Sequence, residues 1–181
     1  MITLNYTISE QEYKDFYYFI GWLAPGKRSF RTKYRLSSIL TYLILFAFVF
    51  YIKGFMYIDL VTIITFLMPV VGLYYYTNYR MKTHFYRLGK KVYKDSDKDN
   101  SEMIIGESGI AAKNKDAEAH YKWSAFVKKY ETNTAYYLLM STNIGLIIPK
   151  RVFNSAAQKE SFEKLLSQYL PLHADLSIDG N

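Results

Sequence analysis

Two long apolar stretches stand out in the distribution of hydrophobic and polar positions along the chain. Residues 36–52 and 60–79 contain no charged side chain. As α-helices, which rise about 1.5 Å per residue, they would measure about 26 and 30 Å, close to the ~30 Å hydrocarbon core of a bilayer. Backbone groups in lipid have no water to bond, so segments that cross it must be helical. We therefore expect a transmembrane hairpin over 36–79, with the short connector 53–59 between its helices.

The N-terminal segment shows two periodicities. Apolar and polar residues alternate from Ile2 to Ile8, which predicts a half-buried strand. Ser9 and Glu12 then have the spacing of a capping box, so a helix with one apolar face should begin at Glu10. An isolated strand leaves backbone groups unpaired, and exposed sheet edges are usually covered. We expect Ile2–Ile8 to dock on the edge of a sheet formed by the C-terminal part of the chain.

Beyond the second apolar stretch, the pattern predicts that the helix continues as a basic amphipathic segment. Its apolar face would hold Met81, Phe85, Leu88 and Val92, and its basic face Arg80, His84, Arg87, Lys91 and Lys94. Two interpretations stay open. Arg80, Arg87, Lys91 and Lys94 could attract anionic lipid headgroups, or the basic face could be solvated and serve only to orient the protein in the membrane.

The C-terminal part predicts a small α+β domain. Short strands separated by turn residues follow one another from 102 to 148, which is typical of an antiparallel meander. Asn154 or Ser155 should cap a closing helix with an apolar face at Phe162, Leu165, Leu166 and Tyr169. The predicted divisions are 1–35 (N-terminal strand and amphipathic helix), 36–79 (hairpin of 36–52 and 60–79), 80–98 (basic juxtamembrane helix and linker), 99–170 (β domain with C-terminal helix) and 171–181 (disordered tail).

Three short motifs in this C-terminal part resemble the YcxB-like membrane protein family. They are Glu107-Ser108-Gly109-Ile110, then Tyr121-Lys122-Trp123 followed by Phe126, and Ile148-Pro149-Lys150-Arg151-Val152-Phe153. The resemblance implies a membrane hairpin and a C-terminal domain similar to bacterial pleckstrin-homology-like domains. The family carries no established catalytic residues, so the resemblance bears on topology and fold far more than on function.

The charge distribution predicts the orientation of the hairpin. Two sets of five basic residues flank it closely, Lys27, Arg28, Arg31, Lys33 and Arg35 before it, and Arg80, Lys82, Arg87, Lys90 and Lys91 after it. The only charged residues of the connector are Lys53 and Asp59. Short segments rich in Lys and Arg stay on the cytoplasmic side. We therefore expect a multi-pass protein of the inner (plasma) membrane with both termini in the cytoplasm.

The residues that carry chemistry form no recognisable catalytic or metal-binding motif. The chain has no Cys, which excludes disulfides and thiolate chemistry. His84, His120 and His173 have no carboxylate at metal-ligand spacing, and Ser108 lacks the context of a nucleophile elbow. We expect no enzyme activity, no cofactor and no metal. The net charge of +7 lies next to the apolar stretches, so lipid is a better partner for it than nucleic acid.

Two kinds of function therefore remain. The first is a membrane-tethered module whose cytoplasmic domain binds a protein segment or an anionic headgroup, and Lys128, Lys129, Lys150 and Arg151 could form its ligand-binding rim. The favoured interpretation of these four residues is a solvated surface, and the ligand-binding rim is the alternative. The second is an interaction protein working in the bilayer, such as an immunity protein that protects its cell from a membrane-directed toxin. The identity of a protein partner and self-association stay open.

Overall fold

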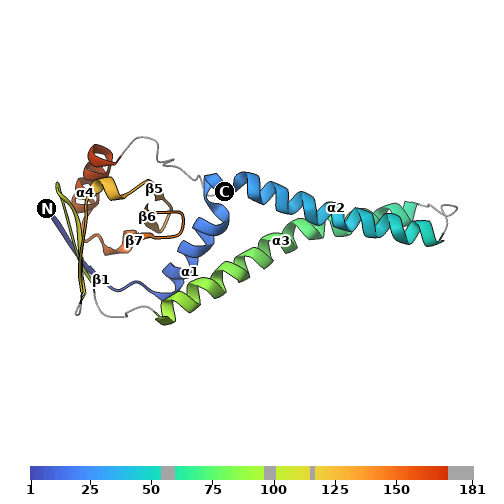
Figure 1. Cartoon of the computed structure of the whole chain (residues 1–181), viewed down its shortest axis with the longest axis horizontal. Helices are drawn as coiled ribbons and strands as arrows, with labels where there is room; N and C mark the ends of the chain where they lie inside the picture. The colour runs from blue at the N-terminus through green and yellow to red at the C-terminus, as the bar shows by residue number, and fades with distance from the viewer. Residues whose placement is uncertain (54–59, 96–100, 115–116, 171–181) are drawn as a thin grey trace.

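The computed structural model of the 181-residue chain describes residues 1–53, 60–95, 101–114 and 117–170. A domain of antiparallel sheets and helices, called here the α/β domain, occupies one end of the molecule, and two long helices project from it (Figure 1). The α+β class with antiparallel sheets, expected from the sequence, is confirmed. Parts of four predicted segments lie outside the described residues: the connector at 54–59, the linker at 96–100, a turn at 115–116 and the tail at 171–181.

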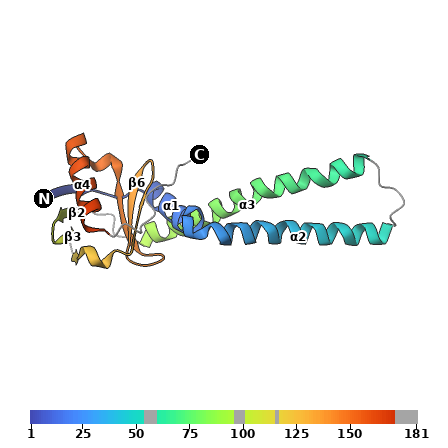
Figure 2. The same ribbon diagram turned by 90° about the horizontal axis from the view of Figure 1, so that it is seen from above.

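The two projecting helices are α2 (Arg28–Lys53) and α3 (Leu60–Asp95). Both leave the same end of the α/β domain (Figure 2). Helix α2 begins eight residues before the predicted span, because Pro25 and Gly26 break the chain just upstream and the Arg- and Lys-rich residues that follow favour a helix. In the described part of the chain, one segment, Pro25–Ile52, is long and apolar enough to cross a membrane.

The N-terminal strand belongs to a sheet whose other strands lie far away in sequence. Strands β1 (Ile2–Tyr6), β2 (Ser101–Gly106), β3 (Gly109–Lys113) and β4 (Glu118–Tyr121) form an antiparallel sheet in that order. Ile2 pairs with Ile105 and Tyr6 with Ser101, which confirms the predicted docking of the N-terminal strand. The long helices are therefore an insertion between two neighbouring strands of one sheet.

The predicted meander is divided into two sheets at Trp123. After β4 the chain makes a 3-10 turn, η3 (Trp123–Ala125), and the Trp123 indole is buried and donates a hydrogen bond to the Gly106 carbonyl at 3.0 Å. Strand β4 therefore ends at Tyr121, before this turn. Strands β5 (Lys128–Glu131), β6 (Ala135–Leu139) and β7 (Gly145–Pro149) form the second antiparallel sheet.

Helix α4 (Ala156–Tyr169) closes the core between the two sheets. Ser155 caps it by accepting a hydrogen bond from the Gln158 backbone N–H at 3.2 Å, as the sequence predicted. Phe162 and Leu166 on its apolar face are buried in the core, beside Leu4 and Ile148.

Helix α1 (Glu10–Tyr18) and the π-helical turn η1 (Phe19–Leu23) form a second core against β5, β6 and β7. The predicted capping box between Ser9 and Glu12 is present at the start of α1. The Phe16 ring lies 5.2 Å from that of Tyr137, and the Phe19 ring lies 5.2 Å from that of Tyr130. The helix predicted at the N-terminus thus covers the second sheet.

The opposite side of α1 lies along α3. Tyr86 donates a hydrogen bond to Asp15 Oδ1 at 2.7 Å, and the rings of Tyr13 and Tyr93 lie 5.8 Å apart. Gly89 is buried where the two backbones approach each other. Of the predicted apolar face, Phe85 packs against Gly21 of η1, whereas Leu88 is 39% exposed. Helix α1 therefore lies between the second sheet and α3 and contacts both.

Candidate functional site

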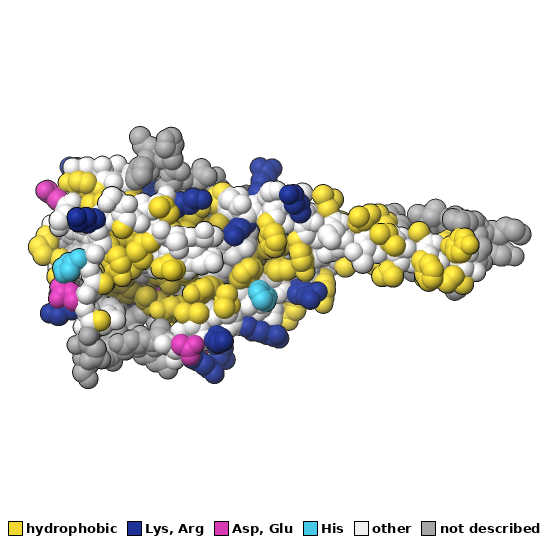
Figure 3. All heavy atoms as spheres, viewed as in Figure 1, with side chains coloured by type: hydrophobic (Ala, Val, Ile, Leu, Met, Phe, Trp, Pro, Cys, Tyr) yellow, Lys and Arg dark blue, Asp and Glu magenta, His cyan; other side chains and the backbone are white. Residues whose placement is uncertain are grey.

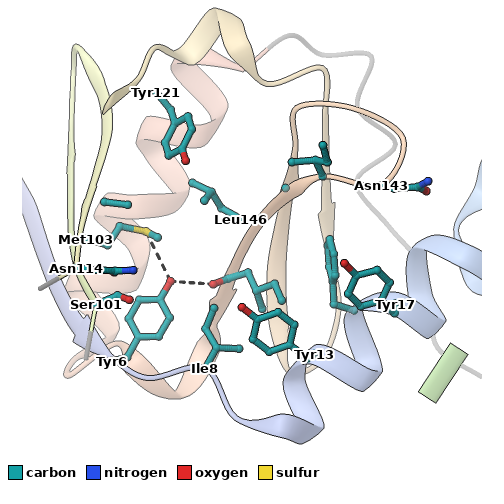
Figure 4. A pocket seen from close by; sticks show the side chains of 15 residues that line it. Tyr6, Ile8, Tyr13, Tyr17, Ser101, Met103, Asn114, Tyr121, Asn143 and Leu146 are labelled. Carbon is teal, nitrogen blue, oxygen red and sulfur yellow. Dashed lines mark hydrogen bonds between the residues drawn. The ribbon is translucent and has the colours of Figure 1, made fainter. Parts of the chain in front are cut away.

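A cavity of about 360 Å³ lies between the two sheets and α1 (Figure 4). Tyr6 projects into it from β1, and its hydroxyl donates a hydrogen bond to the Ile147 carbonyl of β7 at 2.8 Å. This bond bridges the two sheets. Burial raises the pKa of the Tyr6 phenol well above its usual range, so the hydroxyl stays protonated and remains a donor.

The lining of this cavity suits binding better than acid–base chemistry. Tyr13, Tyr17, Tyr121 and Asn143 supply neutral polar groups, and Met103 supplies an apolar surface. Among the described residues that line it, none is Asp, Glu, His, Lys or Arg. Such a cavity can accept an apolar group that carries a hydrogen-bonding atom, and it offers no group that would be ionised near neutral pH.

The four residues considered as a ligand-binding rim do not come together as one. Lys129 is buried, and its Nζ donates a hydrogen bond to the Leu166 carbonyl at 3.1 Å, while burial lowers its pKa. Lys150 Nζ lies 2.5 Å from Glu131 Oε1. Only Lys128 keeps an exposed charge without such a partner in the described structure, because it points away from Lys129 on the same strand.

Arg151, the fourth of these residues, follows β7 and forms hydrogen bonds with α1 and with the segment before it. Its Nε and its NH2 donate hydrogen bonds to the two Glu12 oxygens at 2.8 and 2.9 Å, and the NH2 also reaches the Thr7 carbonyl at 2.7 Å. Burial acts to raise the pKa of Glu12, but hydrogen bonds from Arg151 and Ser9 outweigh it and hold the pKa below its usual value. Arg151 is thus occupied within the fold.

The basic face predicted on α3 is exposed at the end of the helix that adjoins the α/β domain. Arg80, Arg87, Lys91 and Lys94 are all exposed. Within the described ranges, none of them lies within 4.0 Å of a carboxylate oxygen. Lys and Arg side chains gather where the long helices leave the α/β domain (Figure 3). This surface can attract anions without first breaking an internal ion pair.

A second basic cluster was not identified from the sequence as a site. In the sequence, Arg31 and Arg35 served only to predict the orientation. In the structure they contact Trp22, Tyr74 and Asn78 where the two long helices join the α/β domain. The spacing of the arginines, one helical turn apart, was the available signal. Their convergence with Asn78 depends on how α2 and α3 are placed, which periodicity does not report.

Comparison with known proteins identifies one segment of the chain. Residues 105–166 match the family model described as YcxB-like protein. No curated protein and no solved structure matches the chain. The matched segment runs from the end of β2 into α4, contains all three motifs that carried the resemblance, and leaves out β1 and the long helices. The similarity to YcxB-like proteins therefore covers residues 105–166 of the chain.

Proposed function

We propose that this protein is a non-enzymatic, membrane-anchored module that binds anionic lipid headgroups at the cytoplasmic surface of the inner membrane. In this proposal α2 and the apolar half of α3 cross the bilayer as a hairpin, and both termini are cytoplasmic. The observation that carries it is the exposed basic face of α3, formed by Arg80, Arg87, Lys91 and Lys94, directly beside the apolar part of the same helix.

Exposed apolar side chains on both long helices support the hairpin. Leu40 and Phe48 of α2 are 58% and 60% exposed, and Met68 and Val71 of α3 are 76% and 62% exposed. Contiguous apolar surface of this kind is unfavourable in water and is expected in lipid. Since α2 and α3 leave the same end of the α/β domain, a single bilayer can accommodate both (Figure 2).

The position of α1 supports a role for the basic face at the membrane surface. Because α1 contacts both the second sheet and α3, it places the α/β domain beside the helix that carries these charges. Each basic residue near an anionic leaflet contributes about 1 kcal/mol to the attraction. The order of elements in the domain, two antiparallel sheets followed by α4, agrees with the pleckstrin-homology-like fold that the family resemblance implies.

Cysteine labelling tests the topology. The chain has no Cys, so single cysteines can be introduced at Thr3, at Ser108 in the β2–β3 turn and at Gly54 between the long helices. In intact cells, an impermeant thiol reagent should label the Gly54→Cys protein and leave Thr3→Cys and Ser108→Cys unlabelled until the cells are opened. Labelling of Thr3→Cys or Ser108→Cys in sealed cells would reverse the orientation.

Lipid selectivity of the full-length protein in mixed vesicles tests the basic face. Spin-labelled phosphatidylglycerol should be enriched over phosphatidylcholine in the lipid shell around the protein. The enrichment should fall as salt rises, because the attraction is screened. Replacing Arg80, Arg87, Lys91 and Lys94 by Gln should remove most of it, since these four together contribute roughly 4 kcal/mol.

A charge-matched variant provides the control for this experiment. It replaces four basic residues elsewhere by Gln, on β3, α4 and the β4–η3 connection, at the end of the domain away from the long helices: Lys113, Lys122, Lys159 and Lys164. This variant should keep the enrichment of the parent. The same loss in both variants would show that net charge alone attracts the lipid, and would contradict the assignment to α3.

A further inference from the structure

Two arginines of α2 converge at the foot of the long helices in a setting of neutral groups. Arg35 NH2 donates a hydrogen bond to Asn78 Oδ1 of α3 at 2.8 Å, and the Trp22 indole N–H donates to the same oxygen at 3.3 Å. The Arg35 Cζ lies 4.5 Å from the centre of the Tyr74 ring. Arg31 NH1 donates to the carbonyl of Trp22, which is fully buried. Both guanidinium groups are therefore held in place.

The positive charge of this pair is not neutralised by the part of the protein that the structure describes. Arg31 and Arg35 donate to backbone carbonyls and an amide oxygen, and neither lies within 4.0 Å of a described carboxylate. Arg35 Nε is buried and has no hydrogen-bond partner there. Adjacent like charges, partly removed from water, are unfavourable unless an anion compensates them.

The donor groups of this pair suit a phosphate. Two guanidinium groups one helical turn apart are the kind of donor set from which phosphate oxygens accept hydrogen bonds. Burial raises the pKa of the Tyr18 phenol of α1, and the positive charges of Arg31 and Arg35 act in the opposite direction.

The position of the two arginines relative to the apolar run of α2 indicates that the anion would be a lipid phosphate. The uncharged run of α2 begins at Leu36, so Arg35 lies directly at its edge and Arg31 about 6 Å farther from it along the helix. The headgroup layer of one leaflet is roughly 5–8 Å thick. In a bilayer that accommodates the apolar run, the two guanidinium groups would lie at the level of the lipid phosphates.

We propose that Arg31 and Arg35, positioned by Asn78 and Tyr74, form a specific binding site for the phosphate of one anionic phospholipid of the cytoplasmic leaflet. The site rests on the proposed hairpin topology, and it is separate from the exposed face of α3, which has no such fixed geometry. Arg is suited to it because its planar fork can donate two hydrogen bonds to a phosphate while it stacks on an aromatic ring. One lipid should therefore be held more tightly, and with less dependence on salt, than those attracted by α3.

Native mass spectrometry of the full chain tests this site. After exchange from an equimolar mixture of phosphatidylglycerol and phosphatidylethanolamine, the parent should retain one phosphatidylglycerol at a salt concentration that removes the others. Arg35→Gln and Arg31→Gln should each bind that lipid at least about tenfold more weakly, since each loses a charged hydrogen-bond donor. Lys33→Gln is the control, because it removes one positive charge at an exposed position of the same helix.

Three further arms make the outcomes distinguishable. The α3 variant, with Gln at Arg80, Arg87, Lys91 and Lys94, should still retain the one tightly bound lipid. If the α3 variant loses this lipid and Arg35→Gln keeps it, the proposed site is wrong, while the proposed function is unaffected. Arg35→Lys should restore only part of the affinity. Inorganic phosphate at millimolar concentration should not displace the lipid, whereas displacement would mean that the site binds free phosphate. Equal retention in the parent and both single variants, each shown by its melting temperature to be folded, would also refute the proposal.

Discussion

Leu4→Asp is expected to unfold the α/β domain, although Leu4 lies about 100 residues before the strand with which it pairs. Leu4 is 1% exposed, and it pairs with Met103 of β2 in the core that also contains Phe162. Losing a buried leucine costs about 2–5 kcal/mol, and an unpaired buried carboxylate adds to that cost. Since small domains are stable by only about 5–15 kcal/mol, most of this domain should lose its native packing.

Limited proteolysis of the full-length protein measures this effect. Leu4→Asp should expose sites within residues 101–170 that are protected in the parent. The matched control is Thr3→Asp, which introduces the same carboxylate one residue earlier, where the side chain points to solvent. Protease resistance in Leu4→Asp equal to that of the parent would contradict the pairing of β1 with β2. A fragment that begins after α2 would lack β1, so the experiment requires the whole chain.

Gly89→Ala is expected to separate α1 from α3. A Cβ at this position would lie 2.7 Å from the Lys14 Cα and 2.8 Å from the Tyr13 carbonyl oxygen. Both are backbone atoms, so a change of side-chain rotamer cannot relieve the clash, and overpacking of this kind costs roughly 1–3 kcal/mol. The α/β domain should become mobile relative to α3, which can be measured as faster amide hydrogen exchange in residues 10–18.

Gly72→Ala is the control for this substitution. Gly72 lies on the same helix, and a Cβ there would have no atom within 4 Å among those described. Alanine favours a helix over glycine by up to about 1 kcal/mol, so this variant should be as stable as the parent or slightly more stable. If Gly89→Ala behaves like Gly72→Ala, α1 does not hold α3 through this contact.

Several local features of the fold could be predicted from the sequence because they depend on near neighbours in the chain. The alternation at Ile2–Ile8 predicted a strand, which the structure has over Ile2–Tyr6, and Ser9 and Glu12 predicted the start of α1, which the structure confirms. Ser155 was one of two predicted caps of α4. The need of an isolated strand for a partner even predicted the long-range pairing of β1, since unpaired backbone groups must be satisfied somewhere.

The sequence alone thus determined the strands, the helix caps, the long apolar helix α2 and the basic face of α3, because each follows from residue spacing and hydrophobicity within one segment. Only the tertiary structure decided that the meander divides at Trp123, that Lys129 is buried and Arg151 bound to Glu12, and that Arg31 and Arg35 meet Asn78. Each of these depends on contacts between segments distant in the chain. Periodicity reports which face of an element is buried, and it carries no information on the element that covers that face.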